Sequence, residues 1–259
     1  MHKRIMLWQG QAPYTADSPD GFQPSITEYS VSGSRGAVVV VPGGGYVNKA
    51  PHEGGPIAEM INEAGVSAYV LDYRVSPCNT YAPLSDARRA IRLVRSLGYE
   101  KVAILGFSAG GHLTCTAATM YEDGDPTADD PIERLSSRPD AFIPCYPVVS
   151  FSAYSHQGSI EALLGQAHKN DYALIRKFSN ELHITKDTPE AFIWHTASDE
   201  AVPVENSLLL AAAMSAQGVP FELHIFPAGR HGLGLADGIP DVCQWSELLK
   251  TWLKLRNYN

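Results

Sequence analysis

The stretch that decides the fold reads Gly106-Phe107-Ser108-Ala109-Gly110. An apolar run at residues 102–105 precedes it, and a helix-like segment at 111–118 follows it. A serine in a tight turn between a strand and a helix is held above the edge of a sheet, where a base and a substrate can reach its hydroxyl. Such a turn leaves almost no room for side chains at its flanks, which explains the two glycines. The motif predicts a nucleophilic serine.

Apolar strands alternate with helix-like segments along the chain, which is typical of an α/β fold with a mainly parallel sheet and helices on both faces. Residues 1–35 are expected to enter the sheet as antiparallel or irregular structure. The expected strands cover residues 26–31, 37–41, 66–73, 101–105, 141–145, 191–195 and 221–226, and the expected helices cover 86–97, 204–216 and 241–255. Asp86 is expected in the first turn of its helix, where a negative charge suits the helix dipole.

Residues 147–189 carry no strand pattern. They form either a small cap over the active site or a loop with one or two surface helices, and the sequence leaves both open. The length of 259 residues fits a single α/β domain over residues 1–259. The apolar terminal helix serves either that core or a homo-oligomer.

The net charge of −8 argues against nucleic acid and anionic membranes as partners. No apolar run approaches the roughly 18 residues of a membrane span, and the N-terminal apolar run is too short for a signal peptide. Cys78, Cys115, Cys145 and Cys243 form no C-x-x-C pair, which favours reduced, buried thiols in a cytoplasmic protein.

An acid that orients a catalytic histidine is expected after a strand downstream of the serine. Asp199 follows the strand at 191–195, where a buried carboxylate would fix the tautomer of the histidine and stabilise its charged form. Glu200 is the competing acid, and Asp237 is a weaker rival because it lies past the histidine. A helix cap or loop aspartate is the ordinary alternative for Asp199.

The base is expected after the last strand. His231 lies there in a glycine-rich loop that lets the imidazole approach Ser108, although a loop histidine exposed to solvent is the ordinary alternative. His195 and His224 fall within or at the ends of strands and are expected to be core or supporting groups. A metal site made by these three histidines is not expected, because no carboxylate–histidine spacing supports it.

The segment Val41-Pro42-Gly43-Gly44-Gly45-Tyr46 follows the central strand. Its glycines let backbone N–H groups face the cleft, where they can stabilise a developing oxyanion. Gly44 or Gly45 is expected to act together with Ala109, the residue after the nucleophile. A phosphate-binding loop is the rival interpretation, but neither the G-x-x-x-x-G-K-[ST] nor the G-x-G-x-x-G pattern continues the segment.

The order Ser108, Asp199, His231 is that of the α/β-hydrolases. The glycine loop resembles a variant of the H-G-G-G loop of hormone-sensitive-lipase-type esterases, with proline in place of the histidine, and residues 72–77 resemble their D-Y-R-L-x-P segment. The P-G-G-G-Y form, with His-Glu-Gly at 52–54, is closer to a bacterial group of acetyl-xylan and carbohydrate esterases. This resemblance covers residues 35–255 except 147–189.

By that resemblance, Ser108, Asp199 and His231 form the triad, and Gly44, Gly45 and Ala109 supply the oxyanion donors. Tyr46 and Glu53 would flank the mouth of the site, with Tyr46 stacking on a sugar or an acyl group. The alternative for Tyr46 is packing behind the oxyanion loop.

The expected function is that of a serine esterase that removes acetyl groups from sugar hydroxyls, such as those of acetylated xylo-oligosaccharides, with no cofactor and no metal. The alternative enzymes are an aryl formamidase or a peptidase on the same triad. A binding protein without catalysis is disfavoured because all three triad positions are filled.

Overall fold

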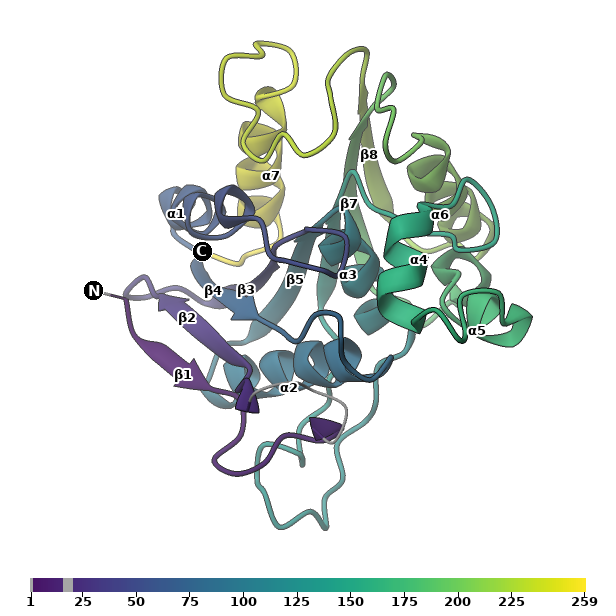
Figure 1. The fold of residues 1–259 in the computed structure, drawn as a ribbon. Helices are drawn as coiled ribbons and strands as arrows, with labels where there is room; N and C mark the ends of the chain where they lie inside the picture. The colour runs from purple at the N-terminus through teal and green to yellow at the C-terminus, as the bar shows by residue number, and fades with distance from the viewer. Residues whose placement is uncertain (1, 16–20) are drawn as a thin grey trace.

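The computed structural model describes residues 2–15 and 21–259, and its centre is one sheet of eight strands (Figure 1). The strand order is β1-β2-β4-β3-β5-β6-β7-β8. The first two strands are antiparallel to their neighbours and the remaining strands are parallel, as predicted. The strands are β1 (Arg4–Met6), β2 (Ser25–Tyr29), β3 (Gly36–Val41), β4 (Ser67–Asp72), β5 (Lys101–Phe107), β6 (Ala141–Cys145), β7 (Glu190–Thr196) and β8 (Phe221–Phe226).

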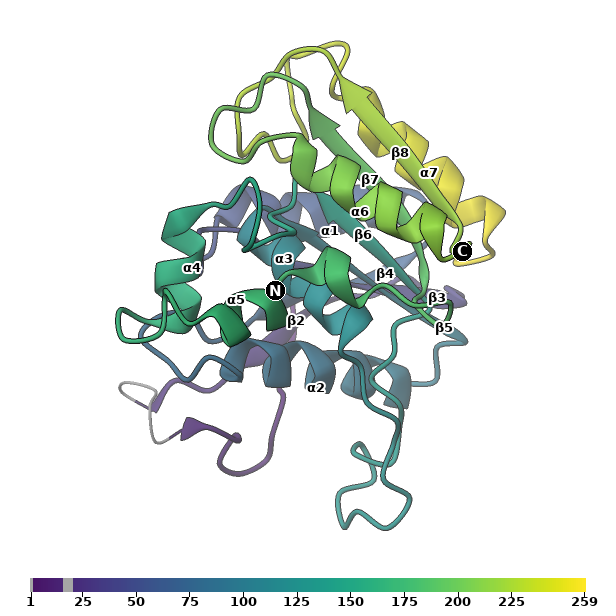
Figure 2. The same cartoon turned by 90° about the vertical axis from the view of Figure 1, so that its right-hand side faces the viewer.

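Helices cover both faces of the sheet, as the sequence predicts (Figure 2). One face packs against α1 (Gly55–Glu63) and α7 (Gln244–Leu255). The other packs against α2 (Ala82–Ser96), α3 (Ala109–Thr119) and α6 (Glu205–Ala216). Trp245 and Trp252 of α7 are buried in the first of these two cores, so the apolar face of the terminal helix belongs to the core.

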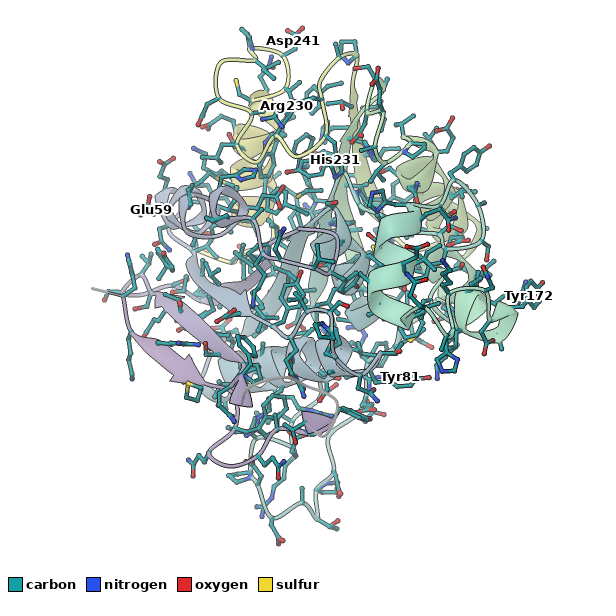
Figure 3. All side chains as sticks on the ribbon, in the orientation of Figure 1. Glu59, Tyr81, Tyr172, Arg230, His231 and Asp241 are labelled. Carbon is teal, nitrogen blue, oxygen red and sulfur yellow. The ribbon has the colours of Figure 1, made fainter. Side chains whose placement is uncertain are left out.

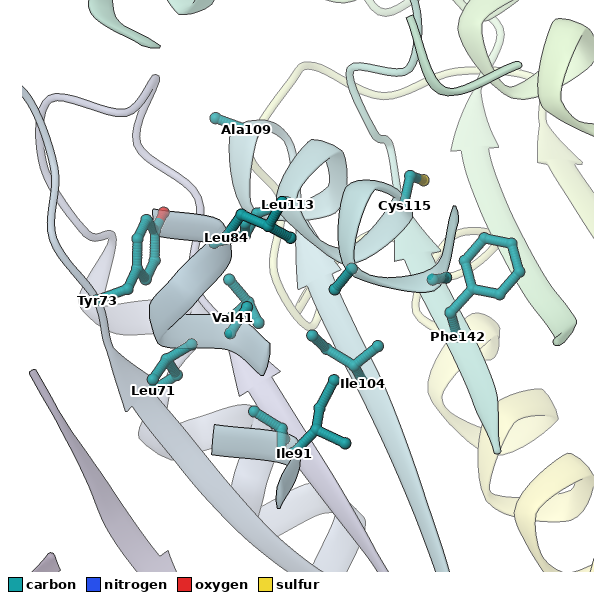
Figure 4. Packing of buried hydrophobic residues seen from close by; sticks show 14 of the residues in the cluster. Val41, Leu71, Tyr73, Leu84, Ile91, Ile104, Ala109, Leu113, Cys115 and Phe142 are labelled. Atoms are coloured by element: carbon teal, nitrogen blue, oxygen red, sulfur yellow. The ribbon is translucent and has the colours of Figure 1, made fainter. Parts of the chain in front are cut away.

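The strand β3 lies in the middle of the sheet and reads Gly-Ala-Val-Val-Val-Val, with every residue buried. Its neighbour β5 runs parallel to it, and the pairing brings Val41 opposite Gly106 at the carboxyl ends of the two strands. Figure 4 shows Val41 and Ile104 packed beneath α2 and α3, with Leu113 of α3 above them. This packing fixes the position of the turn that carries Ser108.

The helix α2 corrects one prediction. It begins at Ala82 rather than Asp86, so Asp86 lies one turn inside the helix and not in its first turn. Asp86 is fully buried and accepts hydrogen bonds from the backbone N–H and the guanidinium of Arg74. Burial raises the pKa of Asp86 to about 6, against the opposing effect of Arg74. The negative charge serves an internal ion pair rather than the helix dipole.

Residues 147–189 form two short helices, α4 (Gln157–Leu164) and α5 (Tyr172–Lys177), followed by the 3-10 turn η4 (Asn180–His183). The excursion closes on itself because the N–H of Asn180 donates to the carbonyl of Val149 at 3.0 Å. The amide oxygen of Asn206 on α6 accepts from the N–H groups of Val149 and Ser150, which anchors the start of the excursion to the main domain.

Among residues 2–15 and 21–259, no helix combines the length and the apolar character that a membrane span needs. The structure places none of the four cysteines in a disulfide; Cys115 and Cys145 are buried as predicted, whereas Cys78 and Cys243 are partly exposed.

Candidate active site

Ser108 stands at the junction of β5 and α3 in a strained backbone conformation, with φ of +54° and ψ of −118°. The turn is as tight as the sequence predicts. A Cβ at Gly110 would collide with the carbonyl oxygens of Val41 and Pro42, and one at Gly106 would collide with the carbonyl of Gly110. The strain costs folding energy and persists because the surrounding strands fix the turn. It presents the Ser108 hydroxyl at the edge of the sheet.

The structure brings the three predicted side chains together. The Nε2 atom of His231 lies 2.7 Å from the Ser108 Oγ, and its Nδ1 atom lies 2.6 Å from the Oδ2 of Asp199. A carboxylate only accepts, so Nδ1 carries the proton and Nε2 is free to accept the serine hydroxyl hydrogen. Figure 3 shows His231 next to Arg230 on the loop that follows β8.

Asp199 is held from three sides. Its Oδ1 accepts the N–H groups of Ala201 and Val202, both at 2.9 Å, while its Oδ2 faces His231. His195, which is fully buried, places its Nε2 3.4 Å from the same Oδ2. Burial alone would raise the pKa of Asp199, but the hydrogen bonds from His195, His231 and the backbone outweigh it and hold that pKa well below its usual range. Asp199 is therefore ionised throughout the neutral range.

The two competing acids, Glu200 and Asp237, do not take the place of Asp199 beside His231. Glu200 is exposed on the loop beside Asp199, and neither it nor Asp237 has a recorded hydrogen bond to His231 within the part of the chain that the structure describes. His224 pairs with Glu222 on β8 at 2.8 Å, so it supports the strand and not the triad. No cluster of three or more His, Cys, Asp or Glu side chains with metal-site geometry occurs in residues 2–15 and 21–259.

The glycine loop lies directly beside the serine, since a Cβ at Gly43 would come within 3.1 Å of the Ser108 Cβ. The Gly43 N–H is already used by the Oε2 of Glu53 at 2.8 Å. Within the described ranges, the N–H groups of Gly44, Gly45 and Ala109 donate to no other part of the chain. Gly44 adopts φ of +130°, which favours glycine, and the loop thereby leaves donors available next to the serine.

Comparison with known proteins adds the family. The family model described as BD-FAE matches residues 27–214. The chain belongs to the BD-FAE family. A solved structure of an acetyl ester-xyloside bifunctional hydrolase from Caldicellulosiruptor lactoaceticus is 44% identical, covers 99% of this chain and 97% of its own, and superposes with a TM-score of 0.93. The predicted α/β-hydrolase fold is confirmed by this likeness and by the strand order.

Two sequence relatives of this BD-FAE family member are longer proteins. The acetylxylan esterase of Xylanibacter ruminicola is 32% identical over 247 residues, which cover 92% of this chain and 49% of that protein. The endo-1,4-beta-xylanase B of Butyrivibrio fibrisolvens is 35% identical over 249 residues, which cover 90% of this chain and 38% of that protein. The chain thus spans half or less of the length of these two relatives.

The predicted positions of Tyr46 and Glu53 at the mouth are wrong for this BD-FAE protein, because both side chains are buried at 1% and 2% exposure. The Tyr46 hydroxyl lies 2.8 Å from the Nδ1 of His112, so Tyr46 packs behind the glycine loop, as the alternative interpretation has it. Glu53 lies under the loop and accepts from Gly43. The Tyr46 ring is therefore not available for stacking on a substrate, and the Glu53 carboxyl is not at the mouth of the site.

Tyr146 is a site residue that the sequence reasoning missed. Its hydroxyl donates to the Oε1 of Glu53 at 2.6 Å and accepts the N–H of Gly234 at 2.8 Å. Burial, reinforced by the nearby Glu53 carboxyl, raises the pKa of Tyr146 well above its usual value, which keeps the phenol protonated. A chain of contacts therefore joins the glycine loop, through Glu53 and Tyr146, to the loop that carries His231. The signal that could have found Tyr146 is its place directly after the strand β6.

Proposed function

We propose that the protein is a serine esterase of a single α/β-hydrolase domain, which removes short acyl groups, foremost acetyl, from the hydroxyls of small carbohydrates or oligosaccharides. The observation that carries the proposal is the unbroken hydrogen-bonded series from the Ser108 hydroxyl through His231 to Asp199, with heavy-atom distances of 2.7 and 2.6 Å. These distances lie within the range at which a base can take the proton of a nucleophile.

The first half of the reaction forms an acyl-enzyme. The Ser108 Oγ attacks the ester carbonyl carbon while His231 Nε2 takes the hydroxyl proton. The negative charge that develops on the carbonyl oxygen is stabilised by the N–H groups of Ala109 and of Gly44 or Gly45. The carbon–oxygen bond to the alcohol then breaks, and His231 delivers its proton to the departing oxygen.

The second half regenerates the serine. Water gives a proton to His231 and attacks the carbonyl carbon of the acyl-enzyme, and collapse of the second tetrahedral intermediate returns that proton to Ser108 Oγ and releases the carboxylic acid, which ionises in water. Asp199 stabilises the imidazolium in both halves because it stays ionised and bonded to Nδ1.

The substrate class rests on the relatives. The names acetyl ester-xyloside hydrolase and acetylxylan esterase belong to proteins that match more than nine tenths of this chain. We infer that this chain acts on the same kind of bond, an acetyl ester of a sugar hydroxyl.

The test is release of acetate from acetylated xylo-oligosaccharides by the native chain and by Ser108→Ala. We expect release by the native chain and a loss of at least about 10⁴-fold in the variant, because the nucleophile is removed. If neither protein releases acetate, xylo-oligosaccharide deacetylation is excluded, and aryl formamides and other acyl substrates become the next to assay.

A further inference from the structure

A hollow borders His231 between the loops that follow β7 and β8. It has a volume of about 590 Å³ and is lined by Ser198, Glu200, Ala201, Gly229, Arg230 and His231. These residues follow β7 and β8, whose carboxyl ends meet at the same edge of the parallel sheet, where ligands of open α/β sheets bind. The hollow adjoins the proposed triad through His231, which lines it, whereas Ser108 and the glycine loop are not among its lining residues.

Hydrogen bonds connect the loop after β7, which carries Ser198, to the loop after β8, which carries Gly229. The Ser198 hydroxyl accepts the N–H of Gly229 at 2.9 Å and lies 3.3 Å from the Gly229 carbonyl. The guanidinium of Arg230 uses one nitrogen, Nη1, to donate to the carbonyl of His231 at 2.8 Å. This bond links the exposed Arg230 side chain to the backbone of the loop that carries His231.

The charged side chains that line the hollow still have hydrogen-bonding groups available for a ligand. Within residues 2–15 and 21–259, the Glu200 carboxyl accepts no hydrogen bond, and the Nε and Nη2 groups of Arg230 donate none. A carboxylate accepts from two hydroxyls at once, and a guanidinium donates in a fixed fork. The only apolar side chain in the lining is the methyl group of Ala201.

The proton transfers of the proposed reaction indicate which half of the ester, the acyl group or the alcohol, lies in the hollow. His231 must protonate the departing alcohol, so that alcohol has to sit beside His231, whereas the carbonyl oxygen sits at the N–H groups of the glycine loop. We propose, on the basis of the proposed esterase function, that Glu200 and Arg230 form the leaving-group subsite and bind neighbouring hydroxyls of a polyhydroxylated alcohol. The subsite favours a sugar over an aryl or alkyl leaving group, because an apolar ring would leave both charged groups without new partners.

The experiment compares two substrates that give the same acetyl-enzyme. A mono-acetylated methyl xyloside and 4-nitrophenyl acetate differ only in the leaving group, so any difference in kcat/KM comes from the alcohol half. The variants are Glu200→Ala, Glu200→Gln, Arg230→Gln and Arg230→Lys, with Glu222→Gln on β8 as a control outside the hollow. Arg230→Lys keeps the charge but not the fork.

We expect kcat/KM for the acetylated xyloside to fall by about 10- to 100-fold in Glu200→Ala and Arg230→Gln, as is typical for loss of a hydrogen bond to a charged group. The fall should lie mainly in KM, and 4-nitrophenyl acetate should change by less than twofold. Glu200→Gln should fall less than Glu200→Ala, because it keeps one acceptor oxygen. Glu222→Gln should leave both substrates unchanged.

Equal losses of kcat/KM on both substrates would show that Glu200 and Arg230 act on the conformation of the loops, which would overturn the subsite. An unchanged kcat/KM on both substrates would overturn it as well. Failure of the proposed function looks different. In that case the native chain releases no acetate from the xyloside, or Ser108→Ala retains the hydrolysis of 4-nitrophenyl acetate.

Discussion

Asp199 and Glu53 are two buried acidic side chains, and each holds one loop of the active site. Asp199 receives two backbone N–H groups on one oxygen and faces His231 with the other. Glu53 also receives a backbone N–H on one oxygen, that of Gly43, but its second oxygen faces the phenol of Tyr146. The two carboxyls are thus bound in nearly the same way on one side and differ in what they face on the other.

That difference separates a carboxylate that stabilises the charge of a protonated histidine in the proposed reaction from a carboxylate that only positions its neighbours. His231 changes protonation during the proposed reaction, so the charge of Asp199 matters in the transition state. Tyr146 stays a phenol, since its pKa is raised well above its usual value. Loss of Glu53 should therefore disturb the position of the glycine loop and the stability of the fold before it disturbs the chemistry of the histidine.

The largest effect is expected for Asp199→Asn. The N–H groups of Ala201 and Val202 require an oxygen at the Oδ1 position, so the new amide nitrogen must face His231. The Nδ1 of His231 then becomes an acceptor and its proton moves to Nε2, where it can no longer accept from Ser108. We expect kcat to fall by about 10⁴-fold, a loss typical of the wrong tautomer in such triads.

The measurement is kcat on 4-nitrophenyl acetate, with the melting temperature as a control for folding. A loss below tenfold would contradict the assignment of Asp199, and the comparison with Glu53 would then lose its basis.

Glu53→Gln should give a smaller loss of activity together with a loss of stability. Glutamine has one oxygen, so either the Gly43 N–H or the Tyr146 hydroxyl loses its acceptor in the interior. We expect the free energy of unfolding to fall by about 1–3 kcal/mol. We expect kcat to fall by up to about 10²-fold, the lower end of what removal of one oxyanion donor costs, because the loop shifts without losing its own donors.

Urea unfolding and acetate release on the same preparations would measure both effects. A 10⁴-fold loss of kcat with unchanged stability would place Glu53 in the chemistry and remove the distinction from Asp199.

Tyr146→Phe tests the link between the two loops. The change leaves the Gly234 N–H and the Oε1 of Glu53 without partners but keeps the ring, which packs edge-on against Trp194 with centroids 4.9 Å apart. We expect a loss of about 1–3 kcal/mol in stability and a fall in kcat smaller than that of Glu53→Gln. The double variant with Glu53→Gln should lose less stability than the sum of the losses in the two single variants, because both substitutions break the same contact. Full additivity would mean that the two residues act independently.

His112 is a buried side chain behind the glycine loop whose protonation should make the stability of the fold depend on pH. It is fully buried, its Nε2 donates to the carbonyl of Phe178 at 2.8 Å, and its Nδ1 accepts from Tyr46. Burial lowers its pKa to about 4, below the usual value of 6.5, although the bond to Phe178 opposes the shift. The unfolded chain therefore takes up the proton first, so the stability from His112 is complete above about pH 6.5 and is lost as the pH falls toward 4.

We expect this group to contribute about 2 kcal/mol to the difference in unfolding free energy between pH 7.5 and pH 5. In His112→Asn the difference between these two pH values should shrink by that amount, as measured by urea unfolding. An unchanged pH dependence in the variant would show that His112 does not act as the titrating group.

Much of the fold follows from local pattern. The apolar strands and the tight turn at Ser108 are visible in the sequence because each depends on neighbouring residues. The helix α1 and the strand β1 are absent from the prediction because both are short, with nine and three residues, and give little periodic signal. Asp86 suggested a helix start, but its partner is Arg74, twelve positions earlier on a different segment, and pairs of that kind leave no local signal.

The candidate site divides in the same way. The order of Ser108, Asp199 and His231 along the strands is enough to place them at one edge of the sheet, and the structure brings them together. Glu53 and Tyr146 meet across 93 positions, so the sequence gives no reason to pair them. The resemblance to the carbohydrate esterases suggested a role for Glu53 at the mouth, but the packing shows that its side chain is buried against the glycine loop.

The ends of the excursion between Val149 and Asn180 are held together by the bond from the Asn180 N–H to the Val149 carbonyl and by the Ser179 hydroxyl, which accepts from the N–H groups of Phe151 and Ser152. A segment that leaves and returns at a single point can change in length or sequence while β6 and β7 stay where they are. Its apolar side chains, among them Ile160, Leu163 and Phe178, are buried in the main core, so a segment grafted from a relative between residues 150 and 179 must bring matching apolar side chains with it.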